Sequence, residues 1–147
     1  MSGLFQDKTT FNDDISSWDV SNVTTMKEMF ENAETFNNGG SNGINDWDVS
    51  NVTSLMGTFY NAESFNGDIS LWDTTNVTDL GFMFGGASSF NRDINTSGSS
   101  WVTSAVTRTS GMFLGATLFN QDLSNWDTSN VIEMDNMFKQ ATSFNGD

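Results

Sequence analysis

Apolar residues along this chain follow two patterns that succeed each other within every repeat. In the first stretch, Ile15, Trp18 and Val20 have the spacing of a short strand. In the second, apolar residues recur at spacings of three and four, which is typical of one helix face. These residues are Val23, Met26, Met29, Phe30 and Ala33. The pattern predicts a short strand followed by a short helix, with Ser21 to Thr24 supplying the N-cap.

The two-part pattern recurs along the whole chain. Each unit opens with Phe-Asn, and successive openings lie 25 or 29 residues apart. Periods of this size are typical of solenoids, in which each coil packs on its neighbours. We therefore expect an α/β fold, a right-handed solenoid of about five coils of 25 or 29 residues. Short parallel strands would line one face and short helices the other. Gly57, Gly81 and Gly111 fall inside the predicted helices and would distort some copies.

A single repeat domain is predicted over residues 1–147. The full units are 11–35, 36–64, 65–89, 90–118 and 119–143. Partial units flank them, with residues 4–10 before and Phe144 opening another after. Because both ends fall within a repeat, the sequence predicts an excerpt of a longer array. Open ends would also allow end-to-end self-association.

Several columns of identical residues have a predicted role in the scaffold. The Phe of Phe-Asn, the tryptophans and the Met-Phe pairs would fill the core, each against its copy in the next coil. Asparagine columns would bond backbone groups at the coil corners. These columns are Asn12, Asn37, Asn66, Asn91, Asn120 and Asn145, and then Asn22, Asn51, Asn76 and Asn130.

The two 29-residue units carry insertions of Gly, Ser and Asn. They span residues 38–43 in unit two and 95–100 in unit four. This composition predicts surface loops. Because insertions in repeats often map to the binding side, these loops are candidates for a partner contact.

Composition narrows the function. The net charge is −14, from 19 acidic and 5 basic side chains, so nucleic acid is not expected as a partner. Direct membrane insertion is not expected either, because no run of 18 apolar residues exists. Histidine and cysteine are absent, which removes the usual general base and the thiolate nucleophile. No nucleotide loop or catalytic dyad is present, so we expect no enzyme.

One family resembles this repeat. Unit one runs Phe-Asn-Asp-Asp-Ile-Ser-Ser-Trp-Asp-Val-Ser-Asn-Val-Thr, followed by Met26, Met29-Phe30 and Ala33. This motif resembles the repeat of BspA-like leucine-rich repeat (LRR) surface proteins, formerly a domain of unknown function in mycoplasma lipoproteins. The resemblance implies an LRR-like solenoid that is extracellular or at the cell surface, and that binds a protein or cell-surface ligand. It implies no shared ligand residues. Unit four departs most, at Val102 and Ala105.

The strongest candidate for chemistry outside the scaffold is a column of aspartates. Alternation would turn them outward from a strand, and in units three to five they would stack at the strand spacing. A bound cation would relieve their repulsion. Calcium takes oxygen ligands of this kind, although solvent and neighbouring hydroxyls could also screen the charges. The candidate metal ligands are Asp14, Asp68, Asp93 and Asp122. A second column, at Asp19, Asp48, Asp73 and Asp127, fits an Asx turn or a helix cap better.

The sequence therefore predicts a non-catalytic surface, adhesion or protein-binding scaffold with no cofactor. The first alternative is a repeat module stiffened by calcium on its aspartate ladders. The weaker alternative is ice or crystal-surface binding through the column Thr24, Thr53, Thr78 and Thr107. Its expected place beside a helix start, rather than on a flat strand face, argues against that function.

Overall fold

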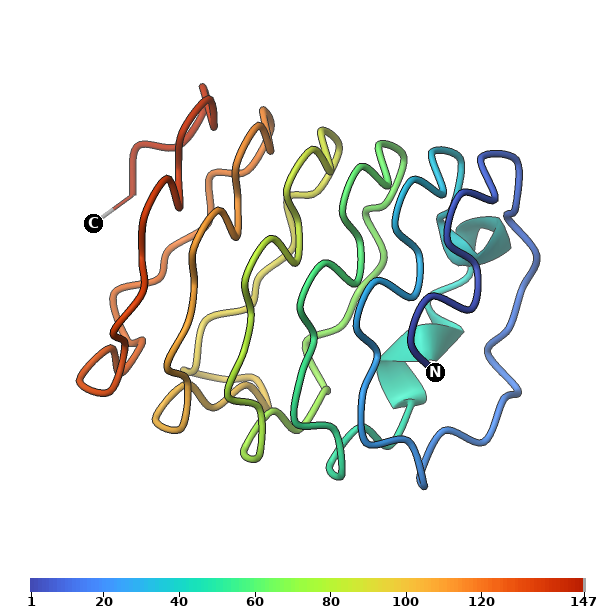
Figure 1. Cartoon of the computed structure of the whole chain (residues 1–147), viewed down its shortest axis with the longest axis horizontal. Coiled ribbons are helices and arrows are strands. Elements are labelled where there is room, and N and C mark those ends of the chain that lie inside the picture. The colour runs from blue at the N-terminus through green and yellow to red at the C-terminus, as the bar shows by residue number, and fades with distance from the viewer. Residues whose placement is uncertain (147) are drawn as a thin grey trace.

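A computed structural model describes residues 1–146 of the chain as a stack of coils. The coils lie side by side along the long axis, from the N-terminal end in blue to the C-terminal end in red (Figure 1). Backbone hydrogen bonds join each coil to the next, as from Thr53 N–H to Thr24 O at 2.9 Å. Asp147, the last residue of the predicted partial unit, lies outside the described residues.

The predicted α/β, right-handed LRR-like solenoid is wrong. Within residues 1–146 the helices are two short 3₁₀ segments, η1 (Asn38–Gly40) and η2 (Gly43–Asp46). The described chain has no strand and no sheet. Parallel pairing is limited to one isolated bridge between neighbouring coils, along the column Thr25, Ser54, Asp79, Arg108 and Glu133.

Two consecutive tight turns occupy the place of each predicted helix. In unit one, Met29 N–H donates to Met26 O and Ala33 N–H to Phe30 O, both at 3.0 Å. Glu28 and Asn32, the third residues of these turns, both have φ of 57°. A positive φ at the third position, with none at the second, defines a type II turn. We call this pair of turns the tandem turns.

The backbone hydrogen bonds explain why no helix forms. An α-helix needs each N–H to donate to the carbonyl four residues before it. Here Glu28 N–H donates to Met56 O at 2.9 Å and Phe30 N–H to Thr58 O at 2.9 Å, both in the next coil. Alternate N–H groups are thus used between coils, and the remainder close the turns.

The tandem turns also explain why the sequence resembles a helix. The first and last residues of each four-residue turn point inward, as the full burial of Met26, Met29, Phe30 and Ala33 shows. Two such turns in succession place apolar residues at positions one, four, five and eight. That spacing is the same as on one face of a helix.

The predicted strand is likewise a pair of turns. Trp18 N–H donates to Ile15 O at 3.1 Å, and Val23 N–H donates to Val20 O at 2.8 Å. Ile15 and Val20 are buried, as an inward-facing strand residue would be. Tight turns at these sites leave no extended segment, so the expected sheet is absent from residues 1–146.

The core consists of two parallel columns of stacked phenylalanine rings. The predicted core position of these rings is confirmed, with Phe30, Phe36, Phe84 and Phe90 fully buried. Paired rings of the two columns lie 3.7–4.1 Å apart, as between Phe84 and Phe90 at 3.8 Å. The columns are Phe5, Phe30, Phe59, Phe84, Phe113 and Phe138, and Phe11, Phe36, Phe65, Phe90, Phe119 and Phe144.

Asparagine side chains connect the coils outside the core, as the sequence predicts. Asn37 Oδ1 accepts the backbone N–H of Asn66 at 2.9 Å, and Asn66 Oδ1 accepts that of Asn91 at 3.0 Å. In the second column, Asn76 Nδ2 donates to Ser50 O of the preceding coil at 2.8 Å. The coil corners therefore use identical residues for identical backbone contacts.

The insertions lie largely at the surface, as the sequence predicts, but each also buries one asparagine in the stack. The segment 38–43 contains η1 and the start of η2, and Asn38 is fully buried. Asn38 Oδ1 accepts Ile15 N–H at 2.9 Å. In unit four, Asn95 is 7% exposed, and Thr96 Oγ1 donates to Asn125 O at 2.7 Å. Part of each insertion therefore packs against the neighbouring coils and belongs to the scaffold.

Candidate binding surface

The outward residues of the tandem turns form one surface across neighbouring coils, which we call the turn face. In each turn the middle two residues point outward, while the ends pack in the core. In units one to four these middle residues are 27, 28, 31 and 32; 56, 57, 60 and 61; 81, 82, 85 and 86; and 110, 111, 114 and 115. Neighbouring side chains bury some of them, at 57, 81, 85, 110 and 111, and the others are half-buried. Their side chains differ from unit to unit, unlike the core and corner columns.

Two aromatic side chains on the turn face lie across glycines of the next coil. A Cβ added at Gly85 would lie 2.9 Å from Tyr60 Cδ2, and one added at Gly111 would overlap the Phe82 ring. The two rings meet edge to face, with centroids 6.0 Å apart and an interplanar angle of 87°. Both rings are half-buried, so each presents part of its surface to solvent.

A hollow of about 230 Å³ opens where this aromatic pair meets unit one. Gly57 lies in its lining without a side chain, and a Cβ there would come 3.3 Å from Glu28 Cγ. Glycine at this turn position therefore leaves space between Glu28 and Tyr60. Its lining residues are Glu28, Glu31, Met56, Gly57, Tyr60 and Phe82.

Two glutamates of unit one are among the residues that line the hollow. Glu28 Oε1 lies 3.4 Å from Lys27 Nζ, and Glu31 Oε2 accepts a hydrogen bond from Gln6 Nε2 at 2.6 Å. The second oxygen of each carboxylate has no hydrogen bond to residues 1–146. Acidic oxygens beside aromatic rings favour a cationic group.

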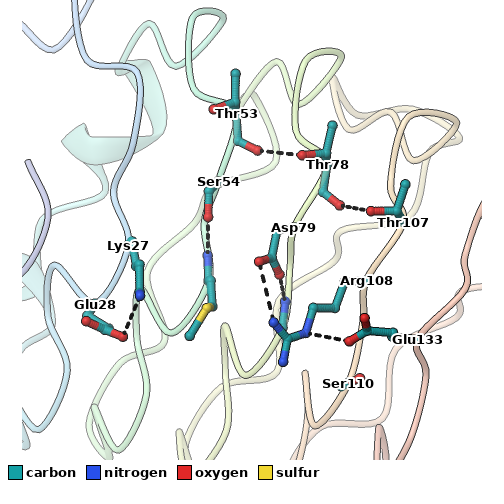
Figure 2. A network of polar contacts seen from close by, with 12 residues as sticks. Lys27, Glu28, Thr53, Ser54, Thr78, Asp79, Thr107, Arg108, Ser110 and Glu133 are labelled. Carbon is teal, nitrogen blue, oxygen red and sulfur yellow. Dashed lines mark hydrogen bonds and ion pairs between the residues drawn. The ribbon is translucent and has the colours of Figure 1, made fainter.

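Charged side chains also bridge the coils beside the turn face, and Figure 2 shows them next to the threonine column. Arg108 Nη1 lies 3.9 Å from Asp79 Oδ2, and Arg108 Nε lies 3.1 Å from Glu133 Oε2. The Nε–H is not directed at the carboxylate, so the second contact is an ion pair without a hydrogen bond. This group ties units three, four and five together.

The threonine column is exposed, and its hydroxyls bond to the backbone. Thr78 Oγ1 donates to Thr53 O at 3.3 Å, and Thr107 Oγ1 donates to Thr78 O at 3.1 Å (Figure 2). The expected helix start beside the column is absent, so that argument against an ice-binding face no longer applies. Ice or crystal-surface binding stays a prediction.

Each predicted metal-ligating aspartate accepts a hydrogen bond from the backbone N–H two residues later. These Asx turns are Asp14 with Ser16, Asp68 with Ser70, Asp93 with Asn95, and Asp122 with Ser124. Hydrogen bonds from the Ser16 hydroxyl and backbone hold the pKa of Asp14 below its usual range. Those from the Ser124 backbone and hydroxyl lower the pKa of Asp122.

The aspartates of this column are not brought together. Over the described residues, no three acidic side chains come close enough to hold a metal ion between them. Each carboxylate is instead paired with its own turn. Calcium on this column remains a prediction, and a thermal unfolding comparison in excess calcium and in chelator would test it.

The second aspartate column also makes Asx turns, as the sequence predicts. Asp19 and Asp48 accept the N–H groups of Ser21 and Ser50, at 3.0 and 3.1 Å. The serine hydroxyls donate to the same oxygens, and this is the main reason why the pKa of each aspartate is lowered. The alternative role as a helix cap is wrong, because a turn rather than a helix follows.

Neither Tyr60 nor Phe82 was predicted from the sequence to have a functional role. Tyr60 is the one tyrosine of the chain, and Phe82 stands where other units have Gly57 or Gly111. A bulky residue in a column of small or polar ones is a signal that a comparison of the units could have found. This signal was missed because the predicted helices did not place Tyr60 and Phe82 on one surface.

The fold and this surface define a tandem-repeat protein of stacked coils. The sequence matches the family described as "Mycoplasma protein of unknown function, DUF285" over residues 1–42 and 39–147. The chain therefore belongs to this family. No curated protein and no solved structure matches it. Among the described residues, no helix has both the length and the apolar character needed to cross a membrane.

Proposed function

We propose that the chain is a non-catalytic protein-binding scaffold and that the turn face is its contact surface. The observation that carries this proposal is that recurring and variable residues occupy different parts of the repeat. The recurring residues serve the core and the corner ladders, while the turn face changes from unit to unit. A fixed scaffold with a variable surface suits recognition of a partner.

The side chains of the turn face support a protein as the partner. Met56, Tyr60, Phe82 and Leu114 are half-buried apolar residues in three consecutive units. Aromatic residues and methionine are enriched in the cores of protein interfaces. Lys27, Glu28 and Arg108 flank this apolar region, as the polar rim of an interface would.

A location at the cell surface is part of the same proposal. It rests on the resemblance of the repeat to BspA-like surface proteins, a family with adhesion among its implied roles. The net charge of −14 also disfavours nucleic acid and anionic lipid as partners. The ligand is therefore proposed to be a protein or a cell-surface component that carries exposed basic groups.

Self-association through the ends of the stack is a separate proposal. An apolar hollow of about 280 Å³ lies at the last coils, among Trp126, Met137 and Phe144. Contact with another stack would remove this apolar surface from water. Light scattering over a concentration series would test it, and a constant monomer mass would contradict it.

The contact surface can be tested with two matched double variants. Tyr60→Lys with Leu114→Lys changes the turn face, whereas Leu71→Lys with Leu118→Lys changes leucines elsewhere that are 55% and 56% exposed. Binding of each chain to purified extracellular and cell-surface proteins would be measured by biolayer interferometry. We expect saturable binding that the first pair abolishes and the second pair retains.

Two results would count against the proposal. The first is no saturable binding to any protein in the set by the unmodified chain. The second is an equal loss of binding in both variants, which would mean that general surface charge rather than the turn face is responsible. Circular dichroism and thermal unfolding of each variant would confirm that the stack is intact.

A further inference from the structure

We propose that the hollow beside Gly57 binds the guanidinium group of an arginine side chain on a partner protein. This inference rests on the proposed function, since it specifies what the turn face recognises. It draws on three features of the hollow: its size, its aromatic rings and its paired carboxylates.

The size of the hollow suits one side chain. Its volume is about 230 Å³, below the range of roughly 300–1,000 Å³ of pockets for drug-sized molecules. It is also an open depression on a face that crosses several coils. An extended partner segment could therefore lie along the turn face and insert a single residue.

The aromatic rings provide a surface for a flat cation. Tyr60 and Phe82 are held at an interplanar angle of 87°, and each is braced by a glycine in the coil beneath it. A cation over an aromatic face is attracted by the negative charge of the ring face. Because both rings are already in place, little side-chain freedom would be lost on binding.

The carboxylates favour arginine over lysine. Glu28 and Glu31, both from unit one, line the hollow. Glu28 accepts no side-chain hydrogen bond within residues 1–146, and Glu31 keeps one oxygen that is not hydrogen-bonded there. A guanidinium presents several N–H groups in one plane, so it can donate to a carboxylate while stacking on a ring. An ammonium is a more strongly hydrated point charge and stacks less well.

The backbone at Phe82 gives additional support. Its φ of 56° lies in the left-handed region, which is unusual for a bulky residue. The equivalent positions in units two and four are Gly57 and Gly111, which adopt this conformation without a steric penalty. Phe82 therefore incurs a conformational cost that glycine would avoid, and its ring forms one wall of the hollow.

A peptide titration followed by NMR would test the inference on the intact chain. The probe is acetyl-Gly-Arg-Gly-amide, and the control is the same peptide with citrulline, which is similar in shape but uncharged. Because Tyr60 is the only tyrosine, its ring signals report on the hollow directly. We expect these signals to shift saturably with the arginine peptide, with a Kd on the order of 1 mM, and little with the citrulline peptide.

Two sets of variants locate the binding. Glu28→Gln with Glu31→Gln should weaken binding at least about tenfold, whereas Glu63→Gln, an exposed glutamate away from the hollow, should leave it within about twofold. Phe82→Gly should also weaken binding while the stack stays folded, because glycine occupies this turn position in two other units.

Three outcomes would overturn the inference: no shift at Tyr60, equal shifts with the two peptides, or equal losses in the Glu63 and Glu28/Glu31 variants. One of these outcomes can occur while the Tyr60→Lys/Leu114→Lys variant still fails to bind a protein that the unmodified chain binds. In that case the proposed function stands without an arginine site. If the arginine peptide binds but no protein does, the hollow is supported and the proposed protein-binding function is contradicted.

Discussion

Indole N–H groups connect neighbouring coils at three of the five tryptophans. Trp72, Trp101 and Trp126 each donate from Nε1 to an isoleucine carbonyl in the preceding coil, at 2.8–3.0 Å. Trp47 is buried, but its Nε1 has no partner among the described residues. The same residue type at the same repeat position therefore has a different energetic role in unit two.

Replacing these tryptophans by phenylalanine should separate the two roles. Trp72→Phe removes a made hydrogen bond, whereas Trp47→Phe removes a buried donor that is unsatisfied. Both changes reduce packing volume, so we expect Trp72→Phe to cost about 1–3 kcal/mol more than Trp47→Phe. Urea unfolding followed by circular dichroism would measure both. A Trp47→Phe cost that equals or exceeds that of Trp72→Phe would contradict this prediction.

Among the elements, the tandem turns decide the character of the outer surface. Each needs a residue with positive φ at its third position, and several units meet this need with glycine. At Gly111 the missing side chain also makes room for the Phe82 ring. The turn thus couples backbone conformation in one coil to side-chain packing from another.

Gly111→Ala should destabilise the fold through backbone strain and through overlap with a side chain. Gly115→Ala should destabilise it through backbone strain alone. Both glycines have positive φ, of 61° and 70°, but a Cβ at Gly115 would meet atoms no closer than 3.9 Å. We expect the left-handed conformation to cost each variant about 1–2 kcal/mol. Overlap with Phe82 should add about 1–3 kcal/mol at Gly111 alone. Measured free energies of unfolding would test this, and Phe82→Gly should remove the excess.

The Asx turns should make stability depend on pH. The Ser21 and Ser50 hydroxyls lower the pKa of Asp19 and Asp48, so the folded state favours the charged carboxylates. This stabilisation is complete above the unfolded pKa of about 3.9 and is lost as pH falls through the lower folded pKa. Ser21→Ala with Ser50→Ala should therefore lower Tm at pH 7 and have less effect at pH 3.

The general charge repulsion changes over the same pH range in the unmodified chain and in the double serine variant. The difference in Tm between the two therefore reports the contribution of the two hydroxyls. A difference that grows on acidification would mean that the serines act in another way. Ser17→Ala is a suitable control, because Ser17 is exposed and makes no side-chain hydrogen bond to the described residues.

Across the whole molecule, the phenylalanine columns run from one end of the stack to the other. Within them Phe84 contacts Phe59 and Phe113 at ring distances of 5.8 and 5.7 Å, as well as Phe90. Because each coil packs only on its neighbours, stability should be a sum of local contributions.

A matched pair of phenylalanine-to-alanine substitutions would measure these local contributions to stability. Phe84 is fully buried between two coils, so Phe84→Ala should cost about 3–5 kcal/mol. Phe138 belongs to the same column but is half-buried in the last full unit, so Phe138→Ala should cost less. Urea midpoints and slopes would be compared, and equal losses at the two positions would argue against a local sum.

Much of this architecture could be predicted from the repeat. The core positions of Phe30 and Phe36, the backbone contacts of Asn37 and the Asx turn at Asp19 are all confirmed. Each follows from a residue whose chemistry permits few alternatives at a recurring position. The hollow beside Gly57 could not be predicted, because it joins side chains from three different units.

The sequence by itself determined the repeat, its two spacings of 25 and 29 residues, and the side chains that face the core. Only the tertiary structure decided between a helix and two turns, since both bury residues one, four, five and eight of the segment. The deciding interaction is the hydrogen bond from one coil to the next, as from Glu28 N–H to Met56 O. A carbonyl 28 residues away takes the N–H that a helix would need, and local spacing contains no information about it.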